Sequence, residues 1–232
     1  MSSLFDHNEI LDSDPDLEVL HDREYRVRAF RKDPNILIRG AVRDQKPPFL
    51  YLADDPGSLT IHHMQVDLEV AFPTLEIVGA MVHFEMHPNE TCPSISDHYE
   101  KLIGLSIARG FSHRVRELFG GPRGCTHTTA LLQAMAPVAV QCFWSMSASD
   151  AKRTAQLAAE RGEPVPGPRP ITKADRDAQW GMNLNTCHIW AEDGQMVSDI
   201  RAGVEISAPL FIRKRMGDLG LPPDEWQRRS RG

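Results

Sequence analysis

Apolar and polar residues alternate along the first third of the chain, the pattern of a β-strand with one buried face. From Leu59 to Val70, His62 falls on the same face as the apolar residues and His63 on the other. A partner strand is predicted from Leu75 to Met86, with Val82, Phe84 and Met86 on one face. Shorter alternations predict strands near residues 25–31 and 36–42. Four successive strands of this kind favour an antiparallel meander with one wet face.

The second half of the chain has helical patterns. Residues 93–119 contain helical stretches broken by glycines, and residues 125–146 are apolar almost all round, which is typical of a buried helix. Pro137 is expected to kink that helix. Beyond it we expect a polar helical stretch to about residue 161, a short helix at 172–180 and a hairpin at Asp193-Gly194. Strands followed by helices predict an α+β fold, with an antiparallel sheet of about four strands and helices packed on one face.

The acidic start of the chain and its Pro-rich stretch after residue 162 predict a division into three parts. Residues 1–22 read as a mobile acidic leader and residues 23–162 as the α+β core domain. Residues 163–232 read as a Pro-rich linker and a C-terminal extension that packs on the core. A length of 232 residues fits one large domain with such an appendage.

Composition and charge argue against several classes of protein. The 26 basic and 32 acidic side chains give a net charge of -6, which argues against nucleic acid as a partner. The start of the chain has no signal-peptide pattern and no apolar run reaches the roughly 18 residues of a membrane span, so we expect a cytoplasmic protein without a membrane partner. The 4 cysteines are far apart in the sequence, which argues against a disulfide framework. The sequence leaves open whether the chain forms a homo-oligomer.

Histidines and cysteines between residues 62 and 127 carry the candidate chemistry. Thiolate and imidazole groups together suit zinc or iron, and a tetrahedral site needs about four of them. His62 lies on an apolar strand face, where an unpartnered imidazole is costly. Cys92 follows the partner strand, and Cys125 and His127 open the buried helix, whose N-terminus favours negative charge. We therefore predict one divalent ion, zinc or iron, held by His62, Cys92, Cys125 and His127, or by three of these residues with one coordination position left open.

Other interpretations compete with this site. The spacing lacks the C-x-x-C signature of a zinc site, and Cys125 with His127 could simply be a structural helix start. Cys125 could also be a nucleophile in a metal-free pocket, activated by the helix terminus. His63 and Tyr99 are the acid–base candidates. No G-x-S-x-G, P-loop or G-x-G-x-x-G motif is present, so the sequence gives no support to an α/β-hydrolase, an NTPase or a dinucleotide-binding protein, and the H-E-x-x-H motif is absent too.

Five segments resemble a bacterial family known only as a domain of unknown function. They are H-H-M-Q-V-D-L-E-V, I-V-G-A, H-P-N-E-T-C-P, L-I-G-L-S-I-A-R-G-F and G-G-P-R-G-C-T-H, within residues 23–145. The usual family forms are H-D-M or H-E-M, P-x-x-x-C and G-C-T-H-L. This chain departs from them at His63, which replaces the acidic residue, and at Thr128, which replaces the leucine.

The order of elements is also distantly similar to iron–sulfur scaffolds of the NifU/IscU type. Those scaffolds place a metal-ligating residue before a V-x-L-x-V strand, then an I-x-x-A strand, a cysteine and a final His/Cys pair that opens a helix. That likeness implies ligand positions at His62, Cys92, Cys125 and His127. It departs in detail, since the scaffold has a cysteine where His62 stands here.

These observations lead to a functional expectation. We expect a metal-dependent enzyme of lyase or hydrolase type that acts on a small organic molecule. The alternative is a carrier or scaffold for a metal ion or an iron–sulfur cluster, and a third interpretation is a structural metal site without chemistry.

Overall fold

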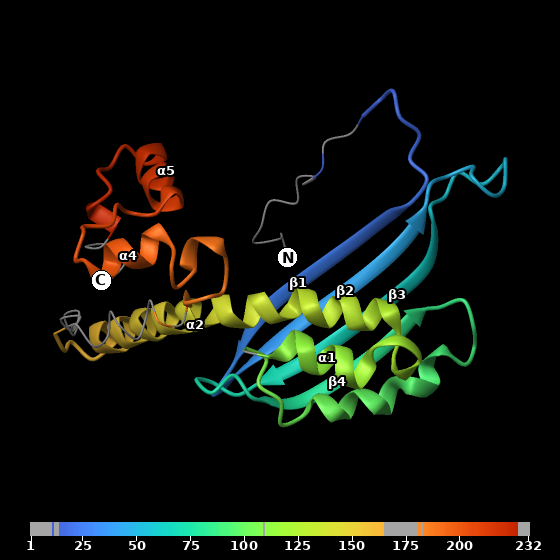
Figure 1. Cartoon of the computed structure of the whole chain (residues 1–232), viewed down its shortest axis with the longest axis horizontal. Coiled ribbons are helices and arrows are strands. Elements are labelled where there is room, and N and C mark those ends of the chain that lie inside the picture. The colour runs from blue at the N-terminus through green and yellow to red at the C-terminus, as the bar shows by residue number, and fades with distance from the viewer. Residues whose placement is uncertain (1–10, 12–13, 109, 165–180, 182, 227–232) are drawn as a thin grey trace. The chain divides into compact units, whose positions relative to one another are not determined.

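A four-stranded antiparallel sheet with the strand order β1-β2-β3-β4 forms the first part of the protein (Figure 1). The computed structural model describes residues 11, 14–108, 110–164, 181 and 183–226. The strands are β1 (Asp22–Lys32), β2 (Asn35–Lys46), β3 (Leu59–Val70) and β4 (Ile77–Met86). Together with the helices, this sheet confirms the predicted α+β class and the meander.

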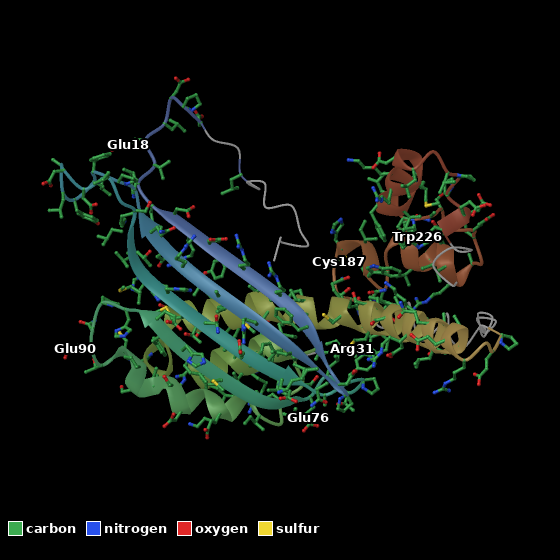
Figure 2. All side chains as sticks on the ribbon, turned by 180° about the vertical axis from the view of Figure 1, so that it is seen from behind. Glu18, Arg31, Glu76, Glu90, Cys187 and Trp226 are labelled. Carbon is green, nitrogen blue, oxygen red and sulfur yellow. The ribbon has the colours of Figure 1, made fainter. Side chains whose placement is uncertain are left out.

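One face of the sheet forms the core. Ile36, Ile38 and Val42 of β2 are buried on this face, as are alternate residues of β3 from Met64 to Val70. The opposite face is turned towards the viewer in Figure 2. This face carries charged pairs such as Arg39 with Asp67, which lie opposite each other in the register of β2 and β3. The period-2 pattern of the sequence therefore maps directly onto the two faces.

Helices cover the core face (Figure 1). They are the 3₁₀ helix η1 (Cys92–Leu102), α1 (Phe111–Phe119), the short η2 (Gly121–Arg123) and the first part of α2 (Thr126–Glu160). A Cβ atom placed at Gly40 of β2 would lie 2.8 Å from the Met135 sulfur of α2, so the helix packs closely on the strand. Pro137 lies inside α2, which continues past it to Glu160.

The predicted face of Met86 is wrong. The β3–β4 register shifts between His63 and Met64, so that Met64 pairs with Phe84 while His63 pairs with Met86. The bulge adds one residue to β4 and moves Met86 to the outer face, where it is 46% exposed. A bulge of this kind leaves no signal in a simple alternation.

The chain divides into two compact units, Met1–Ser145 and Met146–Gly232. The second unit contains the end of α2, the 3₁₀ helix η3 (His188–Trp190), α4 (Gln195–Arg201) and α5 (Leu210–Asp218). The hairpin predicted at Asp193-Gly194 is wrong, because these residues form the turn that starts α4. The helix predicted at 172–180, most of the linker at 163–168 and most of the leader at 1–22 lie outside the described residues.

The packing of the C-terminal extension on the core stays a prediction.

No helix in the described part of the chain is both long and apolar enough to cross a membrane.

Candidate functional site

A buried carboxylate, Asp44, is the centre of the candidate site. It continues the inward row of β2 that begins with Ile36 and Ile38, and it is only 1% exposed. A charged group in such a position costs free energy unless it is paired and hydrogen-bonded. The residues around Asp44 supply those partners.

Two partners come from the neighbouring strands. Arg23 of β1 and His62 of β3 both lie opposite Asp44 in the sheet register, which places the three side chains in one row on the core face. The Arg23 guanidinium donates from Nε to Oδ1 at 2.5 Å and from Nη2 to Oδ2 at 2.7 Å. His62 Nδ1 lies 3.0 Å from Oδ2. The Arg23 pair is bidentate, the strongest geometry for a guanidinium and a carboxylate.

Two further histidines complete the cluster. His127, in the first turn of α2, places Nε2 3.1 Å from Asp44 Oδ2. Its ring stacks on that of His62, with centroids 3.9 Å apart and planes 30° from parallel. His21, just before β1, places Nε2 3.3 Å from Asp44 Oδ1. The sheet thus contributes the row Arg23, Asp44 and His62, and the helix α2 adds His127 to it.

The electrostatics of the cluster fix the charge states of Asp44 and His127. The hydrogen bonds from Arg23 hold the pKa of Asp44 far below its ordinary value, against the effect of burial, so this carboxyl group is ionised. Burial lowers the pKa of His127, and the nearby His62 acts in the same direction, while Asp44 opposes both. His127 is therefore neutral at neutral pH. A neutral imidazole has a lone pair that can bind a metal ion.

Asp44, His62 and His127 could hold a metal ion. Their ligand atoms all lie within 4.8 Å of one another. Among the described residues, no other group of three or more His, Cys, Asp or Glu side chains meets this distance. His62 is 19% exposed and His127 15%, so the cluster is half-buried. Two imidazoles and one carboxylate form the ligand set found in open zinc and non-haem iron sites.

Cys125 lies beside this group without contributing a ligand atom to it. Its sulfur is 3.8 Å from His127 Nδ1, the ring nitrogen on the side away from Asp44. If His127 binds a metal ion through Nε2, Nδ1 carries the proton and faces this sulfur. Outer contacts of this kind fix the ring orientation and the tautomer of a ligating histidine.

Tyr99 contacts the residue directly before α2 through its hydroxyl group. This residue of η1 is 1% exposed, and its hydroxyl accepts a hydrogen bond from the backbone N–H of Cys125 at 2.9 Å. Its ring stacks on Phe119, with centroids 4.7 Å apart. Burial raises the pKa of Tyr99, so the phenol is protonated at neutral pH. The structure places this hydroxyl on the backbone, although the sequence suggested an acid–base group.

Two other predicted site residues lie apart from the cluster. Cys92 is a half-buried residue at the start of η1 and is not a member of the Asp44 group. His63 lies on the outer face of the sheet, where it lines a small cavity of about 170 Å³ with Glu24, Arg26, Ala41 and Arg43. Of the four predicted metal ligands, the structure brings together His62 and His127, with Cys125 next to them.

Sequence reasoning missed Asp44, Arg23 and His21. The signal for Asp44 was present, because an aspartate at the next inward position after Ile36, Ile38 and Val42 breaks an apolar row. Given that aspartate, the cross-strand position of Arg23 follows only from the register of β1 with β2.

Comparison with known proteins assigns the first unit to a family. A family model described as a protein of unknown function (DUF2889) matches residues 21–141. No curated protein and no solved structure matches the chain.

Proposed function

The chain belongs to the DUF2889 family of proteins of unknown function, and we propose from the chemistry of its site that it is a metal-dependent enzyme acting on a small organic molecule. One observation carries the proposal: a carboxylate and two imidazoles from three separate elements place their ligand atoms within 4.8 Å of one another. Buried carboxylates and half-buried histidines gather in this way at metal sites.

The proposed ion is zinc or iron(II), held by Asp44, His62 and His127. Asp44 binds through Oδ2, the oxygen that both histidines approach. Arg23 Nη2 also donates to Oδ2, while Oδ1 accepts hydrogen bonds from Arg23 Nε and His21. This ligand set differs from the one expected from sequence, since Asp44 takes part while Cys92 and Cys125 do not.

Asp44, His62 and His127 would hold the ion with a coordination position left open, and the chemistry it would supply is polarisation of a substrate oxygen or activation of water. Arg23 keeps Asp44 ionised and oriented. With a divalent ion held there, the charges of the ion and Arg23 would outweigh that of the Asp44 carboxylate, and the site would favour a substrate with an anionic or carbonyl oxygen. Hydrolysis or elimination next to such an oxygen is the chemistry that fits best.

The experiment that tests the proposal is metal analysis of untagged protein purified without chelator, followed by zinc, iron(II) and cobalt(II) titrations. We expect about one ion per chain. His62→Ala, His127→Ala and Asp44→Asn should each lose the ion, whereas Cys92→Ser and Cys142→Ser should keep it.

The absorption spectrum of the cobalt(II) protein tests whether Cys125 is a metal ligand. If Cys125 is an outer contact, the cobalt protein has no thiolate-to-cobalt charge-transfer band and Cys125→Ser still binds one ion. A strong band that disappears in Cys125→Ser would restore Cys125 to the ligand set. Absence of any stoichiometric ion after reconstitution would refute the metal site, and several irons with sulfide would favour a cluster carrier.

A second candidate function rests on a different distance. Cys125 Sγ lies 3.8 Å from His127 Nδ1, and His127 Nε2 lies 3.1 Å from Asp44. This thiol–imidazole–carboxylate order is the arrangement of a metal-free thiol nucleophile with its base and orienting group. Rapid alkylation of Cys125 by iodoacetamide in metal-free protein, slowed by His127→Ala and unaffected by His62→Ala, would favour it over the metal enzyme.

A further inference from the structure

The loop that leads into α2 is fixed by unusually close contacts. Gly124 lies so near Phe119 that a Cβ atom there would be 2.4 Å from the Phe119 carbonyl oxygen. The Thr129 hydroxyl donates to the same carbonyl at 3.2 Å. His127 is only three residues beyond Gly124, so the position of its ring depends on how this loop is held.

Tyr99 accepts the hydrogen bond at the end of this loop, directly before α2 begins. The first backbone bond of the helix runs from the Thr129 N–H to the Cys125 carbonyl, so Cys125 is the cap residue of α2. The backbone N–H of Cys125 donates to the Tyr99 hydroxyl, and the Tyr99 ring is held by stacking on Phe119. The helix start is thereby joined to η1 through a buried phenol.

From these contacts we infer that Tyr99 is a positioning residue of the metal site. It acts through Cys125, whose N–H it holds and whose sulfur faces Nδ1 of His127, and so sets the direction of His127 Nε2 towards Asp44. The inference rests on the proposed function, and it assigns Tyr99 no contact with substrate.

The variant that isolates the hydroxyl is Tyr99→Phe. The ring can still stack on Phe119, but the Cys125 N–H loses its acceptor. Loss of an outer-sphere contact typically weakens metal binding about 10- to 100-fold, and we expect the dissociation constant for zinc, measured by chelator competition, to rise about 10-fold. The metal-to-protein ratio at saturation should stay at one.

A matched variant separates positioning from general stability. Ile36→Val removes one methyl group from a buried residue at the opposite end of β2 from Asp44, a change that typically destabilises a protein mildly. It should lower the unfolding midpoint while leaving the zinc dissociation constant unchanged. An equal zinc affinity in Tyr99→Phe and the parent protein, or an equal loss in both variants, would overturn the inference.

The inference and the proposed function fail in different ways. If the parent protein binds no zinc, the metal proposal fails, and the inference is then judged on metal-free protein by the ¹⁵N shifts of the His127 ring. A change of these shifts in Tyr99→Phe but not in Ile36→Val supports positioning of His127. Unchanged shifts overturn it, and the same spectra decide the matter if Tyr99→Phe is too unstable for titration.

Discussion

At the scale of single residues, Asp44 explains most of the site. Its carboxylate is almost fully buried and accepts hydrogen bonds from Arg23 while three histidine nitrogens lie within 3.3 Å. Removal of one partner of a buried charge leaves the other without compensation. Arg23→Met should therefore destabilise the protein by about 1–3 kcal/mol, a typical cost of an unsatisfied buried group.

The lowered pKa of Asp44 predicts how stability depends on pH. An unfolded aspartate takes up a proton near pH 4, while the folded one stays ionised to much lower pH. The stabilisation is therefore complete above about pH 4 and is lost as the pH falls further. Urea unfolding between pH 7 and pH 2.5 should show this loss, and Asp44→Asn should have a shallower dependence below pH 4.

Two comparisons make the pH experiment specific. His127, whose pKa is also lowered from 6.5, acts in the same direction at higher pH, so the comparison is made below pH 4. Glu117→Gln removes an exposed ion pair with Arg114 and should leave the slope unchanged, since exposed pairs contribute little. Parallel curves for the parent protein and Asp44→Asn would contradict the account.

At the scale of elements, the site depends on how the start of α2 lies on the sheet. The row Arg23–Asp44–His62 belongs to three strands, and only the helix adds His127. Gly40 allows the helix to approach β2, and Gly124 allows the preceding loop to pass Phe119. Gly124 needs glycine because a Cβ atom there would be 2.4 Å from the Phe119 backbone oxygen, whereas a Cβ atom at Gly40 would meet only flexible side chains, those of Met135 and Leu131.

Gly124→Ala tests this packing. The new methyl group would meet the Phe119 backbone oxygen and Cβ atom, which cannot rotate away, so we expect a loss of about 1–3 kcal/mol in the free energy of unfolding. The zinc dissociation constant should rise as well, because the loop carries His127. Gly217→Ala, which has open space around it, is the matched control and should be neutral or slightly stabilising. A stable Gly124→Ala protein with parental zinc affinity would refute the argument.

At the scale of the whole molecule, all three proposed ligands lie in the first compact unit and within the residues that match the family. The second unit has its own feature, a groove of about 900 Å³ lined by residues such as Trp190, Ile206 and Trp226. The candidate metal ligands therefore belong to the part of the chain that matches the family, residues 21–141.

Metal binding should stabilise the full chain by mass action. An ion that binds only the folded protein, present at 100 times its dissociation constant, should raise the free energy of unfolding by about 2.7 kcal/mol. Urea unfolding followed by circular dichroism, with zinc and with chelator, measures the difference. Asp44→Asn should show none, and an equal effect of zinc on that variant would indicate binding elsewhere.

The sequence by itself determined the strands, their faces except at Met86, and part of the site. Alternation placed His62 on the core face of β3, and an apolar run placed Cys125 and His127 at the start of a buried helix. These are local properties, because side-chain direction along a strand or helix follows from backbone periodicity alone. The predicted α+β class and the strand order followed for the same reason.

Only the tertiary structure decided which polar groups meet. Cross-strand register brought Arg23 to Asp44, a bulge moved Met86 outwards, and the crossing of α2 over the sheet set His127 beside His62. Register and helix placement depend on contacts between residues distant in the chain, so no local pattern contains them. Cys92 and His63 carry ligand chemistry in the sequence, yet the fold leaves them outside the cluster because one begins η1 and the other faces away from the core.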